Sequence, residues 1–201
     1  MQWAGPDAQP DSPVTSVNVL LVYGTTEGQT RKIARFVAHR LLQSSQKVLT
    51  ADAREAAFIP EPRDFDAVII AASLHAGHYQ RPIIDFVRGN RAAISGKPNA
   101  FLSVSLSAAG SDPRDAADLG RCVADFVRDT GWVPERVHHV AGALLYSTYG
   151  LFTRWVMQRI AARRGGPTDT RRDHELTDWD DLAKFIDAFI GTPSATLRAH
   201  A

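Results

Sequence analysis

Residues 20–41, LLVYGTTEGQTRKIARFVAHRL, place a buried strand directly before an amphipathic helix. An apolar run ends at Gly24, and a loop of hydroxyl and amide side chains follows. In the helix that comes next, Ile33, Val37 and Leu41 recur at helical spacing, with basic residues off that stripe. The first N–H groups of a helix lack internal acceptors and carry partial positive charge, so they bind anions. The stretch therefore predicts a phosphate site between a strand and a helix.

The anion site is assigned to the whole loop, namely Thr25, Thr26, Glu27, Gly28, Gln29 and Thr30. The threonine hydroxyls supply donors, and the glycine lets the backbone approach a ligand closely. Neither G-x-x-x-x-G-K-[ST] nor G-x-G-x-x-G is present, which excludes two familiar nucleotide-binding loops. A hydroxyl-rich loop without lysine is similar to the loop with which flavodoxins bind the phosphate of FMN. The alternative is a helix start rich in capping residues that binds no ligand.

Glu27 is the unexpected member of this loop, because a carboxylate should not face a phosphate. In one interpretation its side chain turns outward and only its N–H serves the loop. In the other, its carboxylate accepts a hydrogen bond from the ribityl chain of FMN or from a neighbouring N–H. The sequence leaves both open.

Strand-like and helix-like segments alternate along the rest of the chain. Apolar segments predict strands at 17–23, 47–52, 66–73, 99–107 and 136–145, and amphipathic segments predict helices at 28–43, 80–90, 112–131 and 177–190, the last capped by Thr177. This alternation predicts an α/β fold, a doubly wound five-stranded parallel sheet with helices on both faces. Ligands of such sheets lie beyond the carboxyl ends of the strands, where the strand order reverses. The loops after the first, third and fourth strands are therefore the candidate site.

The composition fits one folded domain without structural metal or disulfide. The chain has 201 residues, of which 44% are hydrophobic and 22% charged, and its formal net charge is +1. This balance predicts no general attraction to nucleic acid. Cys122 is the single cysteine, and no Cys/His spacing suggests a metal site. No apolar run approaches the ~20 residues of a membrane-spanning helix, so the protein is not expected to cross a membrane.

The chain is expected to contain one domain and two flexible ends. Residues 1–16 are rich in Pro, Asp and Ser, lack the character of a signal peptide, and are predicted to be a disordered extension. Residues 17–191 form the domain, which includes an insertion at 144–174, and residues 192–201 form a flexible tail.

Two further stretches extend the resemblance to flavodoxins and make it more specific. Besides the loop YGTTEGQTRKIA, the sequence contains IIAASLHAGHYQRPIIDFV and AGALLYSTYGLFTRWVMQRIAARRGGPTDTRRDHELTDWDDLAKF. Together and in this order, over roughly residues 17–190, they resemble the flavodoxin-like, menaquinone-dependent protoporphyrinogen IX dehydrogenase family. The most specific elements are GHY at 77–79, AGAL at 141–144 and GG-T-DT at 165–170. The resemblance implies an FMN enzyme of haem biosynthesis that passes electrons from a porphyrinogen to a quinone.

The resemblance assigns the two later loops to the flavin ring. After the third strand these residues are Ser73, Leu74, His75, Ala76, Gly77 and Tyr79, and after the fourth strand they are Ser105, Leu106 and Ser107, whose backbone groups suit the pyrimidine edge. Gly77 suits the backbone flip that flavodoxins make beside flavin N5, because glycine accepts either sign of φ. Tyr79 offers an aromatic face to the ring, or alternatively begins the next helix and packs locally.

The insertion before the last helix is basic and aromatic, and it is longer than ordinary connections. A helix at 150–163 would carry Tyr149 just before it, and within it Phe152, Arg154, Trp155 and Arg159, as candidate contacts to substrate or membrane. Three interpretations stand side by side. The helix lies on an anionic membrane surface, it covers the porphyrin and pairs its propionates with arginine, or it packs on the core with a solvated basic face.

The sequence thus predicts FMN-dependent oxidation of protoporphyrinogen IX, with menaquinone or ubiquinone as acceptor. The expected location is the cytoplasm, with peripheral contact to the cytoplasmic face of the inner membrane as one interpretation. No residue is assigned as a catalytic acid or base. Two alternatives are a flavodoxin-type electron carrier, which would predict an acidic docking surface, and another FMN-dependent quinone reductase. The basic, apolar insertion argues against the first.

Overall fold

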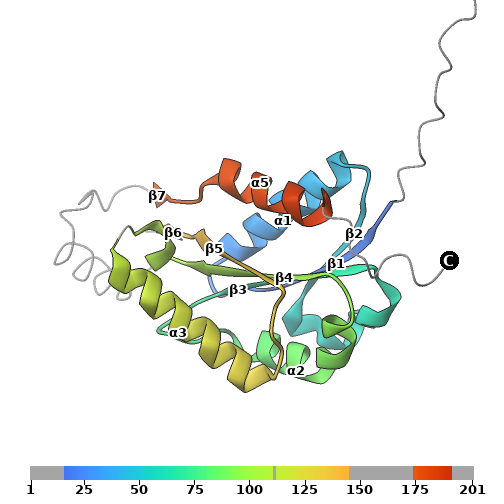
Figure 1. Cartoon of the computed structure of the whole chain (residues 1–201), viewed down its shortest axis with the longest axis horizontal. Coiled ribbons are helices and arrows are strands. Elements are labelled where there is room, and N and C mark those ends of the chain that lie inside the picture. Colours follow the sequence, from blue (N-terminus) through green and yellow to red (C-terminus); the bar gives the residue numbers. More distant parts are fainter. Residues whose placement is uncertain (1–15, 111, 145–173, 192–201) are drawn as a thin grey trace, which may run out of the picture.

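A five-stranded parallel sheet forms the centre of the computed structural model, which describes residues 16–110, 112–144 and 174–191 (Figure 1). The strands are β1 (Asn18–Gly24), β2 (Lys47–Asp52), β3 (Ala67–Ser73), β4 (Asn99–Ser105) and β5 (Arg136–Ala141), and their order is β2-β1-β3-β4-β5. The three inner strands are apolar on both faces because helices cover both, which explains their continuous hydrophobic runs. The predicted flavodoxin-like α/β fold is therefore confirmed.

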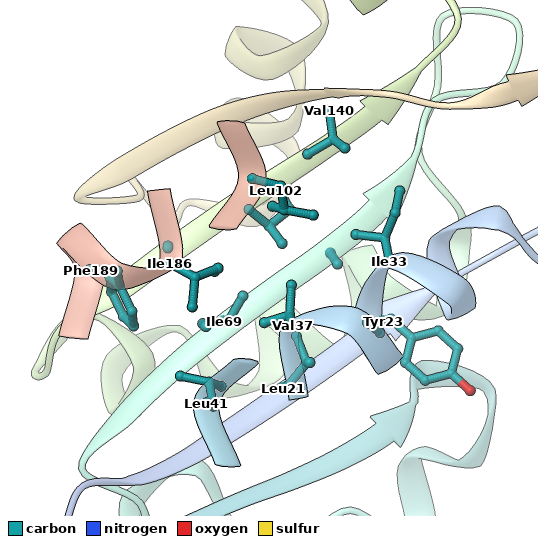
Figure 2. Close-up of a cluster of buried hydrophobic side chains, with 14 of the residues drawn as sticks. Leu21, Tyr23, Ile33, Val37, Leu41, Ile69, Leu102, Val140, Ile186 and Phe189 are labelled. Atoms are coloured by element: carbon teal, nitrogen blue, oxygen red, sulfur yellow. The ribbon is translucent and has the colours of Figure 1, made fainter. Parts of the chain in front are cut away.

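Helices cover the two faces of the sheet in pairs (Figure 1). The long helices are α1 (Gln29–Gln43), α2 (Arg81–Ser95), α3 (Pro113–Thr130) and α5 (Trp179–Gly191), and short 3₁₀ turns are η1 (Ala53–Phe58), η2 (Pro62–Asp64) and η3 (Ser107–Ala109). Helices α1 and α5 pack on one face, and α2 and α3 on the other. Figure 2 shows the first of these interfaces, where Ile33 and Val37 of α1 and Ile186 of α5 meet side chains of the inner strands.

The opposite interface is built around aromatic rings. Phe101 of β4 and Phe126 of α3 stack with centroids 4.6 Å apart, and Trp132 meets both rings edge-on. All three side chains are almost fully buried. Aromatic burial of this size contributes strongly to stability, so this cluster fixes α3 on the sheet.

The strand order reverses at β1, which brings two loops together. Successive strands β1 and β2 are neighbours, whereas β3 lies on the other side of β1. The strands β1 and β3 end in register, with Gly24 opposite Ala72. The loop after β1 and the loop after β3 therefore leave the same edge of the sheet side by side, which is where ligands bind in this class of fold.

A two-stranded antiparallel sheet marks the two ends of the predicted insertion. Strand β6 (Ala143–Leu144) pairs with β7 (His174–Glu175), so the chain leaves and re-enters the domain at adjacent points. The connecting residues 145–173, with Tyr149, Phe152, Arg154, Trp155 and Arg159, lie outside the described residues. So do residues 1–15 of the predicted extension 1–16 and the predicted tail 192–201.

Several local expectations were wrong. The strands predicted at 99–107 and 136–145 end at Ser105 and Ala141. The helix predicted at 80–90 continues to Ser95, because Ile94 is fully buried and adds a turn to the apolar face. Thr177 does not cap the last helix. Its hydroxyl donates to the Ala141 carbonyl oxygen at 2.7 Å, and the Asp178 carboxylate accepts the Asp181 N–H at 2.9 Å instead.

Within the described residues no helix is both long enough and apolar enough to cross a bilayer.

Candidate functional site

The loop after β1 is shaped by a left-handed glycine. Gly28 has φ of +96°, and its N–H donates to the Thr25 hydroxyl oxygen at 2.9 Å. This turn directs the chain into α1, whose first turn has no side-chain cap. The N–H groups at the start of α1 are therefore left for a ligand or for solvent, as the anion-site prediction requires.

Thr30 carries a buried hydroxyl that faces no partner within the described part of the chain. Its side chain is fully buried, and its Oγ1 atom has no hydrogen-bond partner among the described residues. Three buried side-chain atoms in that part of the chain share this property, and the others are Gln80 Oε1 and Trp132 Nε1. Since buried hydroxyls almost always pair, an unpaired one in a predicted anion loop is the arrangement expected if a ligand oxygen is its partner.

Gln80 ties the two switch-point loops together and was not found from the sequence. Its Nε2 donates to the Thr26 hydroxyl at 3.0 Å and also to the Ser73 hydroxyl. A Cβ on Gly24 would lie 3.0 Å from Gln80 Oε1 and 3.3 Å from Ile83 Cβ, so the end of β1 and the start of α2 pack closely here. The one available signal was the position of Gln80, between the GHY motif and the proline that opens α2.

The loop after β3 contains a tight two-residue turn. The N–H and carbonyl of His75 exchange hydrogen bonds with those of His78, at 2.8 and 3.0 Å. Gly77 has φ of +86° and Ala76 has φ of +50°, as in a type I′ turn. The positive φ at Gly77 agrees with the expectation for this position. Ala76 was not expected there, because a left-handed conformation costs a non-glycine residue about 1–2 kcal/mol.

Glu27 reaches across to this turn. Its Oε1 lies 3.8 Å from His75 Nδ1, and 27% of the Glu27 side chain is exposed. Burial raises the pKa of the Glu27 carboxyl group, and the charge of His75 acts in the opposite direction. The carboxylate therefore faces the neighbouring loop, a position that neither interpretation from the sequence had anticipated.

Tyr79 belongs to the hydrophobic core, which corrects the expectation that its ring faces a flavin. The ring contacts Phe101 and Phe126 edge-on, and the hydroxyl forms a 2.8 Å hydrogen bond with Ser103. Only 6% of the side chain is exposed. Burial raises the pKa of Tyr79 to about 12, and the Ser103 hydrogen bond opposes this shift. The alternative, local packing at the start of α2, is the correct one.

The loop after β4 presents mainly backbone N–H groups. The Ser105 hydroxyl accepts the Ala108 N–H at 3.2 Å, and the Ser105 carbonyl accepts the Gly142 N–H at 3.0 Å. The carbonyls of Leu106 and Ser107 accept hydrogen bonds within the η3 turn. Within the described hydrogen bonds, the N–H groups of Leu106 and Ser107 have no acceptor. These two groups are therefore the backbone donors that this loop offers to a ligand.

A polar network joins the start of α1 to strand β7. Gln29 Nε2 donates to Glu175 Oε1 and to the Thr177 hydroxyl, both at 3.0 Å, and Lys32 Nζ lies 2.6 Å from Glu175 Oε1. Although partial burial opposes it, the hydrogen bonds from Lys32 and Gln29 hold the pKa of Glu175 below its usual range. The side-chain amide of Gln29 already donates to Glu175 and Thr177, so the backbone N–H of Gln29 is the group that can bind an anion.

The three loops together offer hydrogen-bond donors. Across the described ranges, no three His, Cys, Asp or Glu side chains gather closely enough to hold a metal ion. The donors converge at the carboxyl edge of the sheet, from the start of α1 and from the loop after β4. Such a site suits an anionic ligand with a polar ring edge.

Comparison with known proteins agrees with this geometry. The model of the family described as "Flavodoxin domain" matches residues 20–171. A protein named protoporphyrinogen IX dehydrogenase [quinone] from Escherichia coli (strain K12) is 33% identical over 171 residues, covering 84% of this chain and 92% of that protein. A Leishmania major protein of the same name is 30% identical over 182 residues, covering 90% of this chain and 78% of its own length.

Solved structures support the fold alone. Oxidised Flavodoxin 1 from Bacillus cereus matches with a TM-score of 0.51 and 16% identity, covering 88% of this chain and 99% of that one. A short-chain flavodoxin associated with a bacterial microcompartment gives the same TM-score and identity, over 89% of this chain and 99% of its own.

Proposed function

Because the chain belongs to the flavodoxin-domain family of quinone-dependent protoporphyrinogen IX dehydrogenases, we propose that it oxidises protoporphyrinogen IX to protoporphyrin IX. FMN is the proposed cofactor, and menaquinone or ubiquinone the proposed electron acceptor. The reaction belongs to haem biosynthesis.

The observation that carries this proposal is the length of the match to the named relatives. The E. coli protein is matched over 92% of its length, and the family model matches residues 20–171, which include all three ligand loops. A plain flavodoxin would share the sheet and the phosphate loop but would not need the later segment. The relatives therefore support the dehydrogenase over the electron carrier.

The residues of the site fit FMN by their chemistry. In the proposal, the N–H groups at the start of α1 and the Thr30 hydroxyl hold the phosphate, because that buried hydroxyl has no other partner among the described residues. The turn at Ala76 and Gly77 faces the ring, and the N–H groups of Leu106 and Ser107 serve its pyrimidine edge. FMN, when bound, supplies two-electron chemistry with the porphyrinogen and with the quinone.

The part played by the chain itself is binding, orientation and electrostatics. Gln80 holds the first two loops in a fixed relation, because one amide nitrogen donates to both Thr26 and Ser73. Ser105 fixes the third loop through its hydroxyl and its carbonyl. Tyr79 takes no part at the ring, since its side chain is committed to the core. No general base is assigned.

We also propose peripheral contact with the cytoplasmic face of the inner membrane, where the quinone is dissolved. The proposed contact residues are those of the insertion, Tyr149, Phe152, Arg154, Trp155 and Arg159, which combine aromatic rings with positive charge. A peripheral enzyme would meet an apolar quinone and a poorly soluble porphyrinogen at the same surface.

The deciding experiment is an anaerobic assay with the FMN-loaded protein, protoporphyrinogen IX and a menaquinone analogue. Porphyrin fluorescence should rise faster than in two controls, one without quinone and one without protein. Anaerobic conditions matter because oxygen oxidises porphyrinogens unaided. A rate equal to the quinone-free control would refute the proposed reaction, even if FMN binds tightly.

A further inference from the structure

We propose that His75 is the counter-charge that makes Glu27 compatible with an anionic ligand, and that the Glu27–His75 pair couples phosphate binding to the uptake of a proton. The proposal rests on the assignment of an FMN phosphate to the loop after β1, made under Proposed function. It identifies His75 as a residue that determines how strongly the site prefers a phosphorylated flavin.

The geometry joins two loops that meet only because of the strand order. Glu27 belongs to the loop after β1, and His75 opens the turn after β3. Their side-chain atoms Oε1 and Nδ1 lie 3.8 Å apart. Glu27 sits one residue before Gly28, at the entrance to α1, where an anion would bind. A carboxylate at this position repels that anion unless a cation accompanies it.

The environment limits how much solvent can screen this repulsion. The Glu27 side chain is 27% exposed and that of His75 is 43% exposed, so both lie partly within the protein. Coulomb interactions between partly buried charges are stronger than in bulk water, because the effective dielectric constant is lower and salt screens them less. The charge state of His75 therefore decides whether the loop presents a neutral pair or a net negative charge.

The other titratable group at this turn is His78. It is the backbone partner of His75 across the turn, and directly paired residues place their side chains on one face. Among the ion pairs of the described residues, His78 forms none with Glu27.

The number of protons bound with the phosphate determines whether the affinity rises or falls with pH. Imidazoles change charge between about pH 5 and 8. A bound phosphate favours the protonated form of a nearby imidazole, so binding at neutral pH takes up a proton. By linkage, the affinity for the phosphate is highest at the acidic end of this range and falls as pH rises.

The test compares FMN with riboflavin, which lacks the phosphate. Dissociation constants are measured by quenching of flavin fluorescence with the flavin-free full chain at pH 5.5 and 8.5. The variants are Glu27→Gln and His75→Asn, with His78→Asn as the matched control from the same turn. The second ionisation of the FMN phosphate, near pH 6, is common to all variants and cancels in comparisons between them.

The expected results differ in direction between the variants. Glu27→Gln should bind FMN about three- to tenfold more tightly than the wild type at both pH values, because it removes one negative charge whatever the charge of His75. His75→Asn should weaken FMN binding about three- to tenfold at pH 5.5 and leave it nearly unchanged at pH 8.5. His78→Asn should follow the wild type, and riboflavin affinity should be similar in all four proteins.

Weaker FMN binding by Glu27→Gln at both pH values would overturn the proposal, because Glu27 would then be a direct contact to the ligand. Identical pH dependence in all four proteins would overturn it as well. A wild-type protein that binds FMN no better than riboflavin would instead refute the phosphate assignment itself. The two failures are therefore distinguishable.

Discussion

Replacing Tyr79 by Phe removes one buried hydroxyl and leaves the aromatic ring in place. The hydroxyl is hydrogen-bonded to Ser103 Oγ at 2.8 Å, and Ser103 is fully buried. The ring keeps its contacts with Phe101 and Phe126, whose centroids lie 5.2 and 5.0 Å away. The substitution therefore tests the hydrogen bond alone, without opening a cavity.

The magnitude follows from the partner that is left behind. Ser103 Oγ would be buried without its partner, which costs about 1–3 kcal/mol of unfolding free energy. Ser103→Ala should lower the free energy of unfolding by a similar amount, because the buried Tyr79 hydroxyl would lose its hydrogen-bond partner. The double variant should be nearly as stable as the wild type, so the coupling energy of the cycle should equal the sum of the two single losses, about 2–6 kcal/mol.

The alkaline pH range provides a second measure of the same group. Burial raises the pKa of Tyr79 to about 12, above its ordinary value of about 10. The neutral phenol thus stabilises the folded state fully below pH 10, and this contribution is lost as the pH rises through about 12. Its size is about 2–3 kcal/mol, and the wild type should lose it while Tyr79→Phe does not.

The assay is urea unfolding of the flavin-free protein, followed by the fluorescence of tryptophan, including buried Trp132. Flavin must be absent because a ligand that binds only the folded state raises apparent stability. FMN affinity is measured in parallel and should change less than about twofold. A loss of FMN affinity with unchanged stability would refute this reasoning and return Tyr79 to the flavin site.

Three further predictions concern other parts of the molecule. Thr30→Ala should weaken FMN binding roughly 10- to 100-fold, since a hydrogen bond to a charged group is worth about 1.5–3 kcal/mol; an unchanged dissociation constant in a flavin titration would place the phosphate elsewhere. Hydrogen bonds from Arg54 hold the pKa of Asp52 below its usual range, so Asp52→Asn should lower the unfolding free energy at pH 7. The difference should begin to shrink below about pH 4 and should be lost as the pH falls through the lowered pKa of the folded state; urea titrations at pH 7 and 3 that show equal differences would contradict this. Replacing residues 145–173 by Asn-Gly, a turn that suits the β6–β7 pair, should leave the free energy of unfolding nearly unchanged but reduce retention on anionic liposomes. Equal retention would refute the membrane proposal.

The fold was predictable because the signals that specify it are local. The apolar runs of β1, β3 and β4 identify strands buried on both faces, and their alternation with helices fixes the architecture. The helix predicted at 112–131 begins as expected, because Asp112 caps α3 and its carboxylate accepts the Arg114 N–H at 2.9 Å. Each of these features depends on neighbours in sequence or on the periodicity of side chains.

The details of the site were less predictable because they depend on contacts between distant residues. Gln80 and Thr26 are separated by 54 positions, and the local sequence around either residue does not predict their hydrogen bond. The same holds for Glu27 and His75. Tyr79 shows the converse problem, since a tyrosine two residues after a loop glycine can point inward or outward. Ser103 and the surrounding rings decide that question, and they come from β4 and α3.

The pairing of β6 with β7 has a consequence for how such a domain can diversify. Because Ala143 lies opposite Glu175, whatever chain joins these strands closes a loop whose ends are already held together. Loop-closure entropy grows only logarithmically with length, so doubling such a segment costs about 0.6 kcal/mol. Changes in the length of that segment should therefore have little effect on the stability of the sheet and of the anion loop. New substrates or surfaces can be selected there by mutation, while the cofactor-binding frame stays constant.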